Sequence, residues 1–175
     1  MSASNGAYGF QGKLPPQNLE AEKGVIGSAL LLVDAIDEIG DLKADHFYAD
    51  RHRMVWQAIL DLHADGVRGI DAVTLAEELD RRKQLGEIGG AEYLGELLEA
   101  VPNAAHAKYY AGIITDRWVQ RNLIYTCTEV LEECYHGECV EVQELLESAE
   151  QKILSLSTDV AKKSVSSIKD VMVDA

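Results

Sequence analysis

Residues 104–135 read AAHAKYYAGIITDRWVQRNLIYTCTEVLEECY, with no proline and one glycine, Gly112. This composition predicts one helix from Ala104 to about Tyr135, far longer than the average globular helix of about 11 to 12 residues. Its apolar side chains are Tyr109, Ile113, Ile114, Trp118, Val119, Leu123, Ile124, Cys127, Val130, Leu131 and Cys134. They are too many for a single stripe. One face should therefore pack on the chain's own domain and another face on something else.

A second helical pattern follows His136 and Gly137. From Val142 to Leu156, apolar residues recur at helical spacing with acidic residues opposite. The two patterns together predict an αα-hairpin over residues 103–156. Such a hairpin would expose apolar surface unless it packs on a second copy, so we expect a homodimer or a higher symmetric assembly.

Five shorter helices are predicted upstream of the hairpin. Asn18 and Asp71 are suited to cap two of them, because their side-chain oxygens accept hydrogen bonds from first-turn N–H groups. No segment shows the period-two alternation of a strand. The predicted helices span Leu19–Leu32, Ala35–Asp41, Arg51–Ala64, Ala72–Lys83 and Ala91–Ala100. The sequence thus predicts an all-α protein, with a small orthogonal helical globule followed by a long projecting αα-hairpin.

Changes in composition divide the chain into four parts. Residues 1–16 have no periodicity and end in two prolines, which predicts a disordered tail. Residues 17–102 form the predicted globular helical head, and residues 103–156 form the hairpin, to which we assign dimerisation. Residues 157–175 begin rich in Ser, Lys and Thr, and are predicted to be a linker followed by the start of an unfinished linker helix.

The overall charge restricts the possible functions. The chain has 175 residues with 16 Lys+Arg against 30 Asp+Glu, a formal net charge of −14. Because non-specific nucleic-acid binding depends on Lys and Arg displacing counterions, strong direct DNA binding is disfavoured. No apolar run approaches the roughly 18 to 20 residues that span a bilayer, so membrane insertion is not expected. Three cysteines without an N-terminal signal segment predict a reduced, cytosolic protein.

Catalytic motifs are weak. A phosphate-binding loop of the form G-x-x-x-x-G-K-[ST] could use only Lys13, but Ala7 replaces the first glycine and Leu14 replaces the hydroxyl residue. No Ser or Cys nucleophile can be paired with a His and an Asp. Glu20 and Glu22 are two apart on a helix and do not face each other, so we interpret both as compensating the helix dipole. The chain alone is predicted not to be an enzyme.

A cluster of soft ligands near the predicted hairpin turn suggests zinc as an alternative. Cys127, Cys134, His136 and Cys139 could in principle bind the metal in a small metal enzyme, but they form no C-x-x-C pair. We expect Cys127 and Cys134 on the buried side of their helix, where cysteine acts as a small hydrophobe. No metal site is therefore predicted.

Several short motifs follow one another along the chain. They are Pro15-Pro16-Gln17-Asn18-Leu19-Glu20-Ala21-Glu22 with Val25-Ile26-Gly27, Phe47-Tyr48 with His52, Gly66 with Asp71, Val73, Thr74 and Leu75, Gly89-Gly90-Ala91-Glu92-Tyr93-Leu94, Val101-Pro102, Tyr110-Ala111-Gly112-Ile113-Ile114, Arg121 with Leu123-Ile124, and Ala149-Glu150. In order and spacing they resemble the N-terminal domain of bacterial replicative DNA helicases of the DnaB type. The series covers about Leu14 to Leu156, and Ile168-Lys169-Asp170-Val171 resembles the start of the family's linker helix.

This resemblance implies a non-catalytic collar domain. In the family the domain pairs through its hairpin, three pairs form a collar on a hexameric ring, and the collar docks the C-terminal domain of primase and is reached by helicase loaders. The parent protein would be an ATP-dependent 5'-3' DNA helicase of the bacterial cytoplasm. ATP and Mg would bind a RecA-like motor that this chain lacks, so no cofactor is expected here. The rival interpretation is a free-standing all-α adaptor or regulator with no motor.

Four residues are candidates for interfaces, and none for catalysis, cofactor or metal binding. Glu20 and Tyr93 lie in matched motifs of the head and are assigned to partner coupling. Ile124 and Val130 lie on the apolar hairpin. For Tyr93, Ile124 and Val130 an ordinary core position remains the open alternative, because aromatic and aliphatic side chains are usually buried. The sequence does not separate a self-interface from a primase interface.

Overall fold

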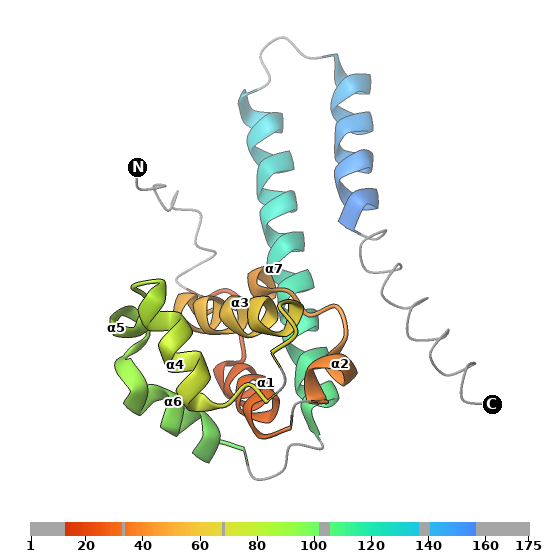
Figure 1. The fold of residues 1–175 in the computed structure, drawn as a ribbon. Helices are drawn as coiled ribbons and strands as arrows, with labels where there is room; N and C mark the ends of the chain where they lie inside the picture. Colours follow the sequence, from red (N-terminus) through yellow and green to blue (C-terminus); the bar gives the residue numbers. More distant parts are fainter. Residues whose placement is uncertain (1–12, 33, 68, 102–105, 137–140, 157–175) are drawn as a thin grey trace, which may run out of the picture. The chain divides into compact units, whose positions relative to one another are not determined.

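The computed structural model describes residues 13–32, 34–67, 69–101, 106–136 and 141–156. All regular elements in these ranges are helices, which confirms the predicted all-α class (Figure 1). The chain forms two compact units. We call Gln17–Trp118 the head unit; of the described residues, the hairpin unit contains 119–136 and 141–156 together with 13–16. Most of the predicted tail and all of residues 157–175 lie outside the described part.

The head unit contains most of the helices. They are α1 (Leu19–Leu31), α2 (Ala35–Ile39), the 3-10 helix η2 (Ala44–His46), α3 (Asp50–Ala64), α4 (Ala72–Arg81), α5 (Leu85–Ile88), α6 (Gly90–Glu99) and the start of α7 (Ala107–His136). The five helices predicted upstream of the hairpin agree with α1, α2, α3, α4 and α6 within about two residues. The predictions missed η2 and α5, because single turns are too short to show a period. Lys83, with φ of 60°, takes the left-handed conformation, so α4 ends before the predicted residue.

Helix α1 is the central element of the head. The Asn18 side-chain oxygen accepts a hydrogen bond from the Ala21 N–H at 3.0 Å, as its capping role predicts. Nine of the thirteen residues of α1 are buried, including Gly24 and Gly27. A Cβ on Gly27 would overlap the Leu97 carbonyl, so the missing side chain allows α1 and α6 to approach closely.

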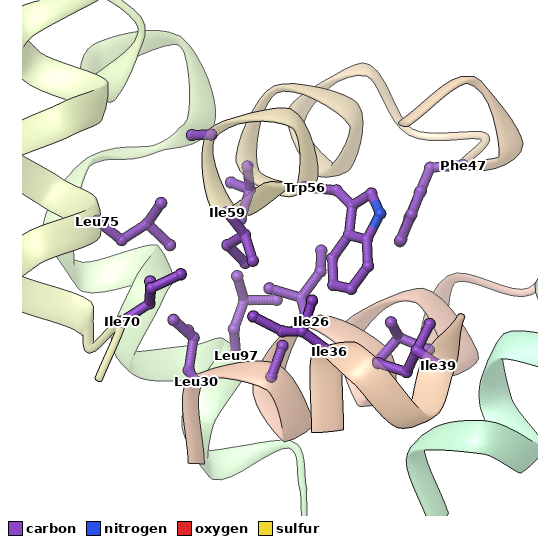
Figure 2. Packing of buried hydrophobic residues seen from close by; sticks show 14 of the residues in the cluster. Ile26, Leu30, Ile36, Ile39, Phe47, Trp56, Ile59, Ile70, Leu75 and Leu97 are labelled. Atoms are coloured by element: carbon purple, nitrogen blue, oxygen red, sulfur yellow. The ribbon is translucent and has the colours of Figure 1, made fainter. Parts of the chain in front are cut away.

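Large apolar side chains from α1, α2, α3, α4 and α6 fill the core (Figure 2). Trp56 of α3 is fully buried, and its indole N–H donates to the Leu42 carbonyl at 2.9 Å. Phe47 lies beside it with ring centroids 5.5 Å apart. The one polar atom of the indole is therefore satisfied inside an apolar core.

The start of α7 belongs to the head. The same core buries Ala107, Ala111 and Ile114. The ring centroids of Trp118 and buried His46 are 4.4 Å apart. The head therefore extends beyond residue 102, where the sequence placed its end. The reason is that the first turns of the long helix supply apolar side chains to the head, while the same helix continues beyond it.

The hairpin unit pairs the rest of α7 with a helix over residues 142–156. Glu133 accepts from Lys152 Nζ at 2.5 Å and from Ser148 Oγ at 3.4 Å, and Lys152 also lies 3.9 Å from Glu129. Because lower residue numbers on one helix face higher ones on the other, the two helices are antiparallel, as the hairpin prediction requires. No helix within the described ranges is long and apolar enough to cross a bilayer.

Candidate functional site

The head contains a buried polar cluster built around Glu22 of α1. Only 1% of Glu22 is exposed, and its carboxylate accepts from the backbone N–H groups of Tyr48 at 2.7 Å and Ala49 at 3.3 Å. These two groups lie just before the first residue of α3, where N–H groups lack helical acceptors. Glu22 thus anchors the start of α3 to α1, with its negative charge at the positive end of the α3 dipole.

His52 of α3 extends this cluster to α6. Its Nδ1 lies 2.6 Å from Glu22 Oε2, and its Nε2 lies 2.6 Å from the hydroxyl of Tyr93. Both Glu22 oxygens already accept backbone N–H groups, so His52 Nδ1 donates to Oε2. In a neutral imidazole Nε2 then accepts from the Tyr93 hydroxyl, and in an imidazolium it donates to the same oxygen. Three helices are joined by one hydrogen-bonded chain.

Arg51 lies at the outer end of this chain. Its guanidinium carbon is 4.1 Å from the centroid of the Tyr93 ring, and the Arg51 side chain is exposed. Burial raises the pKa of the Tyr93 hydroxyl; the Arg51 charge opposes this rise, and Glu96, Glu22 and Glu20 reinforce it. The cluster therefore runs from a buried carboxylate to a surface cation.

The hydrogen-bonded groups of this cluster hold helices together. A carboxylate, an imidazole and a hydroxyl in sequence resemble a nucleophilic triad, but Glu22, His52 and Tyr93 are 1%, 0% and 4% exposed. All three side chains therefore lie in the interior of the head. The arrangement fixes helices α1, α3 and α6 and holds the Tyr93 ring beneath Arg51.

The two residues predicted in the head lie in different environments. The Glu20 side chain is 80% exposed and pairs with Lys23 at 3.2 Å, whereas Tyr93 is buried. The Glu20 charge is one of the causes that raise the pKa of the Tyr93 hydroxyl. Glu20 and Glu22 both lie in the first turn of α1, where the dipole interpretation places them. The sequence did not predict that Glu22 is buried and also binds the backbone N–H groups at the start of α3. Sequence reasoning missed His52 and Arg51 as members of the site; His52 stood in a matched motif, the one signal for it.

The other two predicted residues, both in the hairpin unit, lie on different sides of α7. Ile124 is 43% exposed, while Val130 is half-buried and lies one turn from Glu133, which bonds the second helix. Ile124 therefore belongs to the outward face of α7 and Val130 to its inward side. In the hairpin unit, the exposed apolar side chains of α7 are Leu123, Ile124, Tyr125, Leu131 and Tyr135, and those of the second helix are Val142, Leu146, Ile153 and Leu154.

The cysteines differ from expectation. Cys127 and Cys134 are exposed, so the prediction that they lie on the buried side of α7 is wrong. Both cysteines follow Ile124 at helical spacing on the outward face. The apolar pattern of this helix covers two faces, so the sequence did not show which face is buried. Cys139 and the side chain of His136 lie outside the described part. Among the residues described, no three His, Cys, Asp or Glu side chains are grouped to hold a metal ion.

Comparison with known proteins identifies relatives of this chain. Residues 14–116 match the family described as DnaB-like helicase N terminal domain. The chain is 44% identical over 148 residues to the replicative DNA helicase DnaB of Mycobacterium leprae, covering 83% of this chain and 24% of that protein. It is 38% identical over 165 residues to the replicative DNA helicase DnaB of Geobacillus stearothermophilus, covering 94% and 36%. The chain thus spans about a quarter to a third of these relatives.

Solved structures show the same fold. The crystal structure of the N-terminal domain of DnaB helicase from Mycobacterium tuberculosis matches with a TM-score of 0.75 at 42% identity, over 81% of this chain and 99% of that one. A DnaB-like replicative helicase, whose structure was described with its interactions with primase, matches with a TM-score of 0.67 at 22% identity, over 87% of this chain and 35% of that one. The second likeness concerns the fold alone. The resemblance predicted from the motifs is confirmed.

Proposed function

Because this chain belongs to the family of DnaB-like helicase N-terminal domains, we propose that it is a non-catalytic collar domain that assembles a replicative helicase and docks primase. Assembly proceeds by pairing of two copies through the hairpin, and three such pairs form the collar of a hexamer in the bacterial cytoplasm. By the same proposal, ATP and Mg bind a motor domain of the parent helicase, because this chain spans only 24% and 36% of the two DnaB relatives and holds no phosphate-binding loop.

One observation supports pairing above the others. Each helix of the hairpin keeps an exposed apolar stripe after the two helices have packed together: Ile124 and Leu131 on α7, and Val142, Leu146 and Ile153 on the second helix. Large exposed apolar patches often mark protein–protein interaction sites. A second hairpin carrying the same stripes covers both at once, which gives a four-helix packing with two-fold symmetry.

Primase docking rests on different support. A solved relative with the same fold was described with its interactions with primase. This acidic chain exposes Glu20, whose charge acts on Tyr93, and Arg51, whose guanidinium lies over the Tyr93 ring. Charged groups at a rim favour a salt-sensitive association, so we expect primase binding to weaken as salt rises. Helicase loaders are further candidate partners.

Sedimentation equilibrium tests the pairing. The wild-type chain should be a dimer at tens of micromolar, and Ile124→Asp should yield a monomer with unchanged helicity, because a charge on the outward stripe opposes burial. Tyr125→Asp is the matched control: it is a neighbouring exposed apolar residue on a different face of α7, and it should remain dimeric. Val130→Asp should instead lower helicity, because Val130 is half-buried on the inward side.

A wild-type chain that stays monomeric throughout this concentration range would contradict pairing. Equal dissociation by Ile124→Asp and Tyr125→Asp would show that the outward stripe is not the interface. Circular dichroism on every variant separates dissociation from unfolding.

A further inference from the structure

Among the described residues, Arg51 differs from Arg53, Arg81 and Arg82 in having no hydrogen-bond acceptor. Arg53 donates to the Phe47 carbonyl at 2.7 Å and to Asp50 at 3.0 Å, and Arg81 and Arg82 both bind Glu78. Arg51 forms no hydrogen bond or ion pair with any residue in the described ranges, and its guanidinium instead lies over the Tyr93 ring. An exposed guanidinium on an acidic protein therefore has all five donors unused by the described residues.

The geometry also holds this guanidinium in place. The Tyr93 ring beneath Arg51 is fixed by its hydroxyl bond to His52, and His52 is fixed by Glu22, which is bound to the start of α3. A cation over an aromatic face is attracted by the ring quadrupole. Because the side chain is oriented before any partner arrives, less conformational entropy is lost when its donors are used.

The surrounding charges select the kind of ligand. A planar guanidinium fits a carboxylate or phosphate through two parallel hydrogen bonds. Glu20 and Glu96 lie near enough to act on Tyr93, and the chain carries a net charge of −14, so a phosphate backbone with many charges is repelled. A single carboxylate on a partner protein with an otherwise neutral or basic surface meets Arg51 without this penalty.

We propose that Arg51 is a contact residue that receives a carboxylate from a partner protein, with Tyr93, His52 and Glu22 as the positioning residues that orient it. The inference rests on the proposed function, in which primase docks on this head. It assigns the exposed part of the site to Arg51 and explains how buried Tyr93 can affect docking without touching the partner.

Titration calorimetry of the full chain with the C-terminal domain of primase from the same organism tests the proposal. Arg51→Gln should weaken binding about 10- to 100-fold, the usual range for loss of a charge-assisted hydrogen bond. Arg51→Lys should bind at an intermediate level, since it keeps the charge and loses the planar fork. Arg81→Gln removes the same charge from α4 and should bind as wild type.

Nuclear magnetic resonance separates positioning from mere stability. The Arg51 side-chain signals should carry the ring-current shift of an aromatic face, keep it in Tyr93→Phe and lose it in Tyr93→Leu. In folded Tyr93→Phe, which keeps the ring and loses the bond to His52, primase binding should weaken less than in Arg51→Gln.

Each other outcome has a distinct meaning. Wild-type binding by folded Arg51→Gln overturns the Arg51 assignment while leaving primase docking intact, and so does equal weakening by Arg81→Gln. No binding of primase by the wild-type chain overturns the docking function, and the Arg51 assignment with it. Single-stranded DNA that binds the wild-type chain and is lost in Arg51→Gln, with primase binding unchanged, overturns the carboxylate assignment in favour of phosphate.

Discussion

His52 uses both of its ring nitrogens in a setting that water does not reach. Removing the hydroxyl in Tyr93→Phe should leave Nε2 buried without a partner, at a cost of about 1–3 kcal/mol in the free energy of unfolding. Urea unfolding measures the loss. Tyr109→Phe is the control, because the Tyr109 side chain is 68% exposed, and its stability should stay close to wild type. Equal effects of the two substitutions would argue against the hydrogen-bonded chain.

The same residues show where sequence reasoning reaches its limit. The Asn18 cap was predictable because its acceptor and donor are three residues apart. Glu22 was not, since the groups it binds lie 26 to 30 residues away and become neighbours only after α3 packs on α1. The prediction that Cys127 is buried was wrong for another reason. The sequence of a helix with two apolar faces does not show which face packs against its own chain.

At the scale of elements, replacing glycine by alanine should change the free energy of unfolding in opposite directions at two positions. Gly27→Ala places a Cβ against the Leu97 carbonyl and the Val101 side chain, so α1 and α6 must separate, at a cost of about 1–3 kcal/mol. Gly95→Ala faces open space within α6 and should stabilise the head by about 0.5–1 kcal/mol, because alanine loses less backbone entropy. Chemical unfolding of both variants checks the pair. Destabilisation by both would refute the close approach as the cause.

Long helices were predictable and single turns were not. The apolar stripe of α3 and the cap of α4 are local signals, and both helices begin within one residue of expectation. Helix α5 occupies four residues around Gly86, where a turn was expected, and it depends on packing of buried Ile88 against the core. Elements that tertiary contacts stabilise leave little trace in a local pattern.

For the whole molecule, acid stability should depend on one ion cluster within a highly acidic chain. Glu78 binds Arg81 and Arg82, and Arg82 also binds Asp61 of α3 at 2.8 Å. Hydrogen bonds from the two guanidinium groups lower the Glu78 pKa from 4.5 to about 2. Because the folded pKa is the lower one, this stabilisation is complete above pH 4.5 and is lost as the pH falls toward about 2.

Unfolding of wild-type and Glu78→Gln chains across this range measures the effect. The variant should be less stable at pH 6, and the difference should shrink as the pH falls toward about 2. Glu92→Gln removes an exposed carboxylate that forms no ion pair with the described residues, and should change stability little at pH 6. A difference that stays constant over the whole range would exclude Glu78 ionisation as its source.

The placement of Trp56 and Trp118 has an optical consequence. These are the chain's two tryptophans, and both belong to the head unit. Tryptophan fluorescence, excited selectively so that Tyr125 and Tyr135 of the hairpin unit do not contribute, therefore follows the melting of the head, while far-ultraviolet dichroism also records the helices of the hairpin unit. If the hairpin frays before the head, dichroism changes at a lower temperature than emission does. The native sequence thus allows the cooperativity between the two units to be measured without attaching a dye.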